Sequence, residues 1–425
     1  MTKTKTICVL TLGCRVNSYE SESIVSSLQK LGYNVITNLS FADYYVINTC
    51  AVTNEAERKS RGYISKCLKL NPKAKIYICG CASEKNPESF KTKPNVEYVI
   101  GTSAKLKIVD KIAGTSSYGE ESDKLKYDDT YSAGHTRARA NIKIQDGCNN
   151  FCTYCIIPYL RGRERSRSLD SIKNEIDRLE QTTSEIVITG INTSSYGRDL
   201  TGQNISLIDV AKLFVGRNVK FRFSSLEVGI ITDSFLKALK NIPEFQQHFH
   251  LSMQSGSDTV LKSMNRKYTS KQYLEKVNLI RKYFPDAGIT TDVIVAFPTE
   301  TKENFEETID TCSKANFLWI HVFPYSKRDG TVAAKYKNIN DGIVSSERVQ
   351  MLTNLACSMR DKFIIDRINK EYDMIVEQSK DGYIIGHTTN FIKCYARSNI
   401  EIEPNKIIKV KIKKVQNDGA LCEIL

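Results

Sequence analysis

Three closely spaced cysteines are the residues of this chain whose types point most directly to chemistry. Cys148, Cys152 and Cys155 form a C-x3-C-x2-C triplet in the segment IQDGCNNFCTYCIIPYLRGR. Three thiolates without a fourth nearby can hold three irons of a [4Fe-4S] cube and leave the fourth iron open. An open iron predicts a cluster that binds and cleaves a ligand, because a fully ligated cluster would only carry electrons.

The two competing interpretations of this triplet are a zinc site and a group of reduced structural thiols. Structural zinc usually takes four ligands, as two C-x2-C pairs or together with histidine. The chain has five histidines, and none lies within ten residues of the triplet. The pattern therefore favours an iron–sulfur cluster over zinc.

The elements that must position these thiols alternate between strands and helices. The first 110 or so residues repeat a strand-then-helix rhythm, which predicts an open, mostly parallel α/β sheet. A helix is expected over residues 54–70, and Asn71-Pro72 ends it. The expected strands cover residues 6–12, 44–48, 75–79 and 96–100.

A second set of cysteines follows the ends of three of these strands. Cys14, Cys50 and Cys81 each sit just past a strand. Because the carboxyl ends of parallel strands share one edge of the sheet, the three thiols can converge in space. Three unrelated buried thiols would give the same pattern, and topology alone leaves both interpretations open.

The central part of the chain alternates again and predicts a partial, open (β/α)6 barrel with its site at the strand carboxyl ends. The cluster loop follows the first barrel strand. Strands are expected at residues 140–145, 185–189, 220–224, 248–253, 290–296 and 319–323. Helices are expected at residues 169–181, 207–214, 232–240, 271–283 and 302–315.

The last 60 or so residues change to a period of two, which predicts a small, OB-like β-barrel. In the strand IKVKIK, the lysines alternate with apolar residues and form a basic face suited to an RNA backbone, although an ordinary solvated face is the alternative. These lysines are Lys409, Lys411 and Lys413. The predicted domains are residues 1–112, 134–364 and 365–425, with a polar linker at residues 113–133.

Composition narrows the class of protein and its partners. The 425 residues carry a net charge of +13, which favours a polyanionic partner, nucleic acid before a membrane surface. We find no signal peptide and no apolar run of the length that a membrane span requires. A cytoplasmic protein is expected, in which the 13 cysteines are metal ligands and buried thiols and do not form a disulfide framework.

Taken together, these features resemble the methylthiotransferase family of radical S-adenosylmethionine (SAM) enzymes over nearly the whole chain. The triplet spacing and the aromatic Tyr154 between its last two cysteines fit the radical SAM superfamily. The resemblance implies a methylthiotransferase domain, a radical SAM barrel and an RNA-binding TRAM domain. It also implies that Cys14 in TLGCRVNSYES, Cys50 in INTCAVTNEAERKSR and Cys81 in CGCASE ligate a second [4Fe-4S] cluster.

Finer motifs resemble the branch that adds a methylthio group to C2 of N6-threonylcarbamoyladenosine at position 37 of tRNA. These are TLGCRVNSYES, KIQDGCNNFCTYCIIPYLRGRERSRS, QSGSDTVLKSMNRKYT and HVFPYSKRDGT. The alternatives are the N6-isopentenyladenosine branch and the branch that modifies an aspartate of ribosomal protein S12. A non-enzymatic iron–sulfur RNA-binding or redox-sensing protein is a further alternative, and it would cleave no SAM.

The chain departs from the family pattern at three places. The family's GFPGE-like segment reads AFPTE, with Ala296 and Thr299 in place of glycines near the expected SAM pocket. LSMQSG stands where LPLQSG is usual. Cys79 is an extra thiol two residues before Cys81, and a side chain that points into the sheet is expected for it.

The resemblance implies that the two clusters do the chemistry, so no protein acid or base is assigned a catalytic role. The cluster of the N-terminal domain would hold the sulfur, which one SAM methylates. A second SAM at the Cys148 triplet would supply the radical that activates C2. Both open irons are expected to face one cavity between the domains. An external electron donor such as flavodoxin or ferredoxin and a sulfur source are implied partners, together with the tRNA anticodon stem-loop.

Polar residues after the barrel strands are candidate SAM contacts, with helix capping as the alternative role. They are Thr189, Gly190, Asn192, Ser225, Glu227 and Gln254. Four arginines within seven residues follow the triplet, and their position favours phosphate contacts over a solvated helix face. They are Arg161, Arg163, Arg165 and Arg167.

Overall fold

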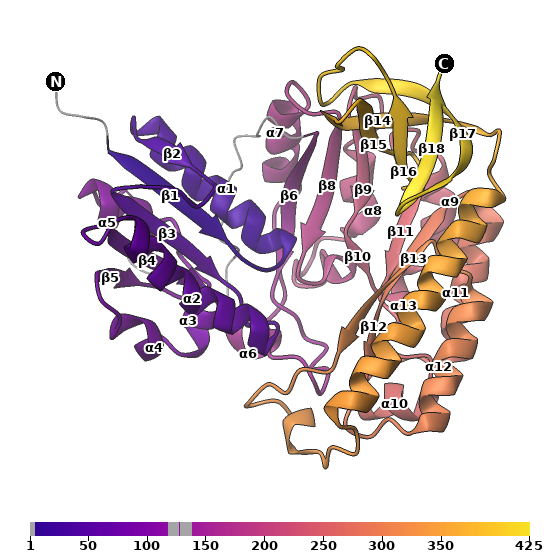
Figure 1. Ribbon diagram of the computed structural model, residues 1–425, viewed down its shortest axis with the longest axis horizontal. Coiled ribbons are helices and arrows are strands. Elements are labelled where there is room, and N and C mark those ends of the chain that lie inside the picture. Colours follow the sequence, from indigo (N-terminus) through magenta and orange to yellow (C-terminus); the bar gives the residue numbers. More distant parts are fainter. Residues whose placement is uncertain (1–4, 118–126, 128–137) are drawn as a thin grey trace.

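The computed structural model describes residues 5–117, residue 127 and residues 138–425. Figure 1 shows an N-terminal α/β domain beside a larger α/β barrel, with a small β-barrel packed on one end of the larger one. Most of the predicted linker at residues 113–133 lies outside the described residues. No helix in the described ranges is both long enough and apolar enough to cross a membrane.

The N-terminal domain is a five-stranded, wholly parallel sheet in the order β2-β1-β3-β4-β5. Its strands are β1 (Thr6–Thr11), β2 (Asn34–Ile36), β3 (Tyr44–Thr49), β4 (Lys75–Gly80) and β5 (Val96–Val99). Helices cover both faces because alternate strand residues are apolar on each side. One face packs against α1 (Arg15–Lys30) and α5 (Lys107–Ala113). The other packs against α2 (Asn54–Leu70), α3 (Cys81–Lys85) and α4 (Glu88–Lys91).

The central domain contains six parallel strands that curve into an incomplete barrel (Figure 1). They are β6 (Arg139–Asp146), β8 (Glu185–Gly190), β9 (Lys220–Phe223), β11 (His248–Leu251), β12 (Gly288–Val295) and β13 (Trp319–Pro324). One bridge, Phe221 to Phe245, joins the two halves of the sheet. The short strands β7 (Arg165–Ser166) and β10 (Ser225–Leu226) pair with β6 and β11. The predicted open barrel is confirmed.

The barrel helices pack outside the strands, over a core rich in phenylalanine, leucine and isoleucine. They are α7 (Leu169–Leu179), α8 (Leu207–Lys212), α9 (Asp233–Lys240), α11 (Ser270–Tyr283) and α12 (Lys302–Ala315). The shorter α6 (Ile157–Arg161) follows the cysteine loop, and α10 (Asp258–Ser263) follows β11. The long α13 (Gly342–Ile365), which the sequence interpretation did not include, runs from the barrel to the C-terminal domain.

The C-terminal domain is a closed five-stranded barrel in the order β14-β15-β16-β18-β17. Its strands are β14 (Glu371–Lys380), β15 (Tyr383–Thr388), β16 (Lys393–Arg397), β17 (Ile407–Gln416) and β18 (Gly419–Ile424). The predicted alternation along β17 is confirmed, because Val410 and Ile412 are buried while Lys409 and Lys413 are exposed.

This small barrel closes the amino-terminal end of the larger one. The Phe391 ring stacks on His248, with ring centroids 4.1 Å apart, and it also lies 4.1 Å from the Arg222 guanidinium. Arg139, the first residue of β6, pairs with Glu377 of β14. The opposite, carboxyl end of the barrel strands therefore remains available for a site.

Candidate active site

The cysteine loop begins directly after β6 and needs a glycine at its first turn. Gly147 has φ +71°, and a Cβ atom there would lie 1.8 Å from the carbonyl oxygen of Arg163. The Cys148 amide donates to the Gly162 carbonyl at 3.1 Å, and the Thr153 amide donates to the Met264 carbonyl at 3.1 Å. The loop is thus fixed by the chain on both sides, and its three thiols are half-buried.

The three thiols of this loop are close enough to act on one another. Burial raises the pKa of Cys148 to about 11 and that of Cys155 to about 12, and neighbouring thiols of the triplet add to both shifts. Thiols with such values stay protonated at neutral pH until a metal displaces the proton.

The described sulfurs are not already arranged for a single zinc ion. Three thiolates on one tetrahedral zinc lie about 3.8 Å apart, for zinc–sulfur bonds of about 2.3 Å. In the described part of the chain, neither cysteine triplet has all three Sγ atoms within 4.8 Å of one another. The donor types, three thiolates and no nearby histidine, are those of a cluster in which each sulfur binds a different iron. The donor set therefore fits a [4Fe-4S] group.

A cavity of about 530 Å³ opens beside this loop. Cys152, Asn192, Glu227 and Arg266 contribute to its wall. Arg266 donates to the Cys152 sulfur at 3.4 Å and forms an ion pair with Glu227. The Asn192 side-chain amide lies 4.0 Å from the Cys148 sulfur. The cavity thus offers a carboxylate, a guanidinium and amides next to the triplet.

Two of the six candidate SAM contacts, Asn192 and Glu227, line this cavity. Thr189 is buried at the end of β8, and Gly190 packs against Gln145. Ser225 and Gln254 are also absent from the described residues that line the cavity. Sequence reasoning missed Arg266, although it lies within the quoted motif QSGSDTVLKSMNRKYT.

The departures in AFPTE have a local structural meaning. Ala296 has φ +55°, a left-handed conformation that costs a residue with a Cβ atom about 1–2 kcal/mol, which explains why glycine is usual there. The Ala296 amide donates to Glu300 at 2.9 Å, which holds the turn. The Thr299 hydroxyl is buried without a hydrogen-bond partner in the described structure.

The second triplet converges at the carboxyl edge of the N-terminal sheet. Cys14 follows β1, Cys50 follows β3 and Cys81 begins α3. A Cβ atom on Gly13 would lie 2.7 Å from the Cys50 sulfur, so glycine permits this approach. Burial raises the pKa of Cys50 to about 11, with further contributions from Cys81 and Cys14. Cys79 is buried on the face covered by α1 and α5, in a separate apolar cluster.

A buried ion-pair network joins the two triplets. Arg161 donates to Glu20 at 2.9 Å and to Asp146 at 3.0 Å, and it lies near enough to the Cys81 thiol to favour its thiolate. Asp146 lies two residues before Cys148. We call the connected set the Glu20 network; it consists of Glu20, Lys105, Lys143, Asp146 and Arg161.

Helix α1 carries a second bridge to the barrel one residue earlier. The Tyr19 hydroxyl donates to Glu175 at 3.0 Å, and Glu175 forms a buried ion pair with Arg167. Tyr19 and Glu20 thus attach the N-terminal sheet to β6 and α7. Because both contacts are buried, they fix which edge of that sheet faces the cysteine loop.

This geometry rules out the predicted phosphate binding for two of the four candidate arginines. Arg161 and Arg167 have no exposed side-chain surface and are paired with carboxylates, so neither can reach a phosphate. Arg165 is largely buried and donates to the carbonyl oxygens of Arg161 and Arg163. Arg163 is exposed and stacks on Phe151, with its guanidinium 4.6 Å from the ring centre.

The sequence matches known families over both α/β domains. Residues 6–101 match the uncharacterized protein family UPF0004, and residues 142–312 match the radical SAM superfamily. A threonylcarbamoyladenosine tRNA methylthiotransferase MtaB of Bacillus subtilis is 36% identical over 99% of this chain and 97% of its own length. An MtaB of Thermotoga maritima is 34% identical over 98% and 96%. A tRNA-2-methylthio-N(6)-dimethylallyladenosine synthase of Thermoanaerobacter sp. is 36% identical over 92% and 84%.

Solved structures share the fold at low sequence identity. The radical SAM methyltransferase TsrM from Kitasatospora setae, with cobalamin and a [4Fe-4S] cluster bound, has a TM-score of 0.52 at 11% identity, over 81% of this chain and 84% of its own. The cobalamin-dependent SAM radical enzyme OxsB has a TM-score of 0.51 at 12% identity, over 81% and 56%.

The Glu20 network predicts a large effect of removing one carboxylate. We expect Glu20→Gln to lower the free energy of unfolding by about 3–5 kcal/mol, because buried cations lose their partner. The double variant Glu20→Gln/Lys143→Met removes one charge of each sign and should recover most of that loss. Urea unfolding followed by circular dichroism measures both, and equal midpoints for the wild type and Glu20→Gln would contradict the prediction.

The same network predicts a loss of stability in acid. Burial acts to raise the pKa of Glu20, but Arg161, Lys105 and Lys143 outweigh it and hold the pKa well below its ordinary value. A depressed carboxylate pKa contributes stability above about pH 4.3, and this contribution is lost as the pH falls towards the folded-state value. We expect the urea midpoint of the wild type to fall more steeply below about pH 4 than that of Glu20→Gln/Lys143→Met. Parallel pH profiles would show that Glu20 is not the group responsible.

Proposed function

Because the chain belongs to the methylthiotransferase family of radical SAM enzymes, we propose that it methylthiolates C2 of N6-threonylcarbamoyladenosine at position 37 of tRNA. The observation that carries the methylthiotransferase function is the buried connection between two cysteine triplets, each at the carboxyl edge of its own sheet. The relatives named above act, by their names, on threonylcarbamoyladenosine or dimethylallyladenosine in tRNA.

Sequence identity does not separate these two tRNA substrates, because relatives with either name are about equally similar to the chain. The residue after Cys14 supports the first substrate. Arg15 is exposed, and in the described part of the chain its guanidinium forms no hydrogen bond or ion pair, although Glu185 is near enough to act on it. Desolvation by surrounding atoms and the nearby Arg139 lower the pKa of Arg15, while Glu185 acts to raise it, as expected for a cation in a partly desolvated space between domains.

An unpaired guanidinium in a partly desolvated space favours an anionic ligand. The threonylcarbamoyl group ends in a carboxylate, whereas a dimethylallyl group is uncharged and apolar. Arg15 is therefore proposed to bind the threonyl carboxylate and to place the base between the two triplets.

Membership of the family implies a [4Fe-4S] cluster and SAM, and Cys148, Cys152 and Cys155 would hold that cluster. When bound, the cluster and SAM supply the radical chemistry that an unactivated aromatic C–H bond requires. The chain's own groups bind and orient: Arg266 donates to the Cys152 sulfur, while Asn192 and Glu227 offer polar contacts in the adjoining cavity. Glu227 is held by its ion pair with Arg266.

A second cluster at Cys14, Cys50 and Cys81 is part of the proposal, with a sulfur source and a flavodoxin or ferredoxin as electron donor. The three thiols fit this role because they converge, and because Arg161 and Lys105 lie close to Cys81 and favour its thiolate. The tRNA backbone is proposed to contact Arg163 and the exposed lysines of β17. Lys411 is half-buried, and the exposed Lys413 forms an ion pair with Glu423 at 2.6 Å, so Lys409 is the most accessible of the three.

Cluster composition gives the first test. The anaerobically reconstituted wild type should contain about eight irons per chain, and Cys81→Ala about four. Cys81→Ala should still cleave SAM under reduction and form no methylthio product, whereas Cys152→Ala should cleave none. Iron analysis and chromatographic assay of 5′-deoxyadenosine measure these outcomes. About four irons in the wild type would remove the second cluster from the proposal.

Substrate choice gives the second test. Arg15→Gln should lose at least about tenfold in kcat/KM with tRNA that carries threonylcarbamoyladenosine, because a charge-assisted hydrogen bond contributes about 1.5–3 kcal/mol. Arg15→Lys is the matched control and should retain most activity. Nucleoside mass spectrometry of the reacted tRNA measures the product. Faster methylthiolation of isopentenyladenosine than of threonylcarbamoyladenosine by the wild type would overturn the substrate assignment.

A further inference from the structure

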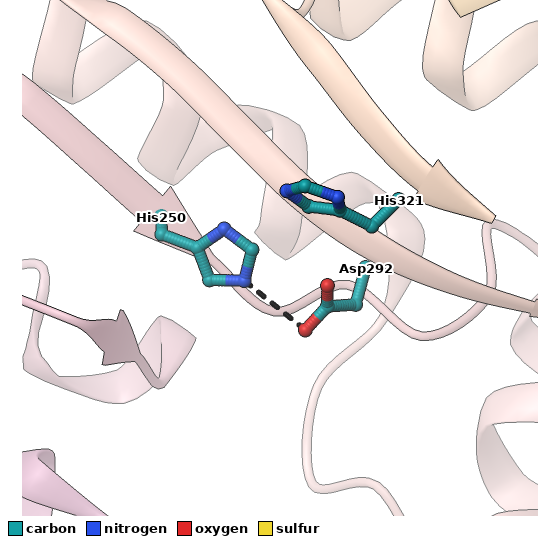
Figure 2. A group of neighbouring side chains, drawn as sticks. All are labelled: His250, Asp292 and His321. Carbon is teal, nitrogen blue, oxygen red and sulfur yellow. Dashed lines mark hydrogen bonds and ion pairs between the residues drawn. The ribbon is translucent and has the colours of Figure 1, made fainter. Parts of the chain in front are cut away.

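Two histidines and an aspartate form a compact group on the barrel strands, apart from both cysteine triplets. They are His250 on β11, Asp292 on β12 and His321 on β13, and Figure 2 shows their side chains directed towards one another. We propose that this group is a binding site for a divalent first-row transition-metal ion. The proposal does not depend on the proposed function, since it concerns a different set of ligands.

The strand register places all three side chains on one face of the sheet. Asp292 is directly opposite His321, and His250 is opposite Thr290, two residues before Asp292. Because strand side chains alternate, residues two apart share a face. The residues on the other face, including Phe249, Val293 and Ile320, are buried against the outer helices. The group therefore lies on the inner face of the partial barrel.

The distances are close to those that one metal ion requires. One nitrogen of each histidine and one carboxylate oxygen of Asp292 all lie within 4.8 Å of one another. Ligand atoms on one tetrahedral ion lie about 3.4 Å apart, for bonds of about 2.1 Å. The Nε2 atom of His250 and Oδ2 of Asp292 are already 3.0 Å apart. Small side-chain rotations are enough to bring His321 into the same shell.

A second layer of hydrogen bonds holds His250 in the orientation that a ligand needs. Its Nδ1 atom lies 2.9 Å from Oγ1 of Thr290, which also lies 2.9 Å from Nε2 of His248. A hydroxyl has one proton, so Thr290 can donate to His248 while it accepts from His250. In that arrangement the proton of His250 is on Nδ1 and the lone pair of Nε2 faces Asp292. Metal-binding histidines are commonly held in this way.

The donor types select the class of ion. Calcium and magnesium prefer shells built from oxygen atoms, and this group offers only one carboxylate. Two imidazoles and a carboxylate suit zinc, iron(II), cobalt(II) or nickel(II). The Arg15 guanidinium is near enough to act on His321 and opposes cation binding by charge alone. The ion must therefore be held by coordination, which again favours a transition metal.

The site is also open to solvent. His321 is exposed, and His250 and Asp292 are half-buried. Three protein ligands leave at least one coordination position for water or another ligand, whereas a closed structural zinc site has four protein ligands. An ion here would be exchangeable and would face the interior of the partial barrel.

Zinc is the probe for the test, added to holoprotein whose clusters are intact and which has been treated with chelator. After desalting, the wild type should retain about one zinc per chain by mass spectrometry of the metals, with its iron content unchanged. His321→Ala and Asp292→Asn should retain none. Asp310→Asn is the matched control, because Asp310 is an exposed carboxylate on α12, and it should bind as the wild type does.

Three results would overturn the proposal: no retained zinc in the wild type, equal zinc in all four proteins, or zinc uptake accompanied by loss of iron. The first would leave His250 and Asp292 as a hydrogen-bonded pair without a metal. The last would place zinc on the cysteines. Zinc should also raise the thermal unfolding midpoint of the wild type and of Asp310→Asn, but not that of His321→Ala. Because His321 is exposed, that variant should fold normally.

Discussion

The arrangement of this protein depends on the burial of one carboxylate, Glu20, among three cations. An unpaired charge of this kind would be strongly unfavourable inside a protein, so the N-terminal domain and the barrel are constrained to meet where Lys143 and Arg161 can reach it. Helix α1 supplies both Glu20 and Tyr19, and each binds a group of the barrel. These buried polar contacts therefore contribute to the relative orientation of the two sheets, together with the ion pair between Arg328 and Glu57 and the packing of Ile156 and Leu160 against the N-terminal core.

This constraint has a direct consequence for chemistry. Asp146 and Arg161 lie on either side of the Cys148 loop, and Arg161 also lies close to Cys81 of the other triplet. The Glu20 network therefore joins the two domains at a point close to both triplets. The proposed function requires a radical-generating group and a sulfur-carrying group to share a cavity, and under that proposal the Glu20 network brings them close without contributing an acid or a base.

The sequence was most informative where a property repeats locally. Strand and helix periodicity predicted both α/β domains, and the position of three cysteines after three strands allowed them to converge, which the family resemblance then implied. It was misleading for Arg161 and Arg167, because a basic run after the triplet suggests phosphate contacts unless its carboxylate partners are known. Glu20 lies 141 residues from Arg161, and Glu175 lies 8 residues from Arg167. Only the pair of Glu20 and Arg161 joins two domains. The group formed by His250, Asp292 and His321 was not predicted, because its members sit on three separate strands.

The most direct test of the account is to separate SAM cleavage from product formation in one protein. The double variant Glu20→Gln/Lys143→Met keeps the six cysteines and the net charge of the network but removes the contact between Glu20 and Lys143 across the domain boundary. With both clusters reconstituted, the account predicts that SAM cleavage under reduction continues at nearly the wild-type rate, while methylthiolation of tRNA falls at least about tenfold. Methylthiolation at the wild-type rate would show that the network does not position the two triplets.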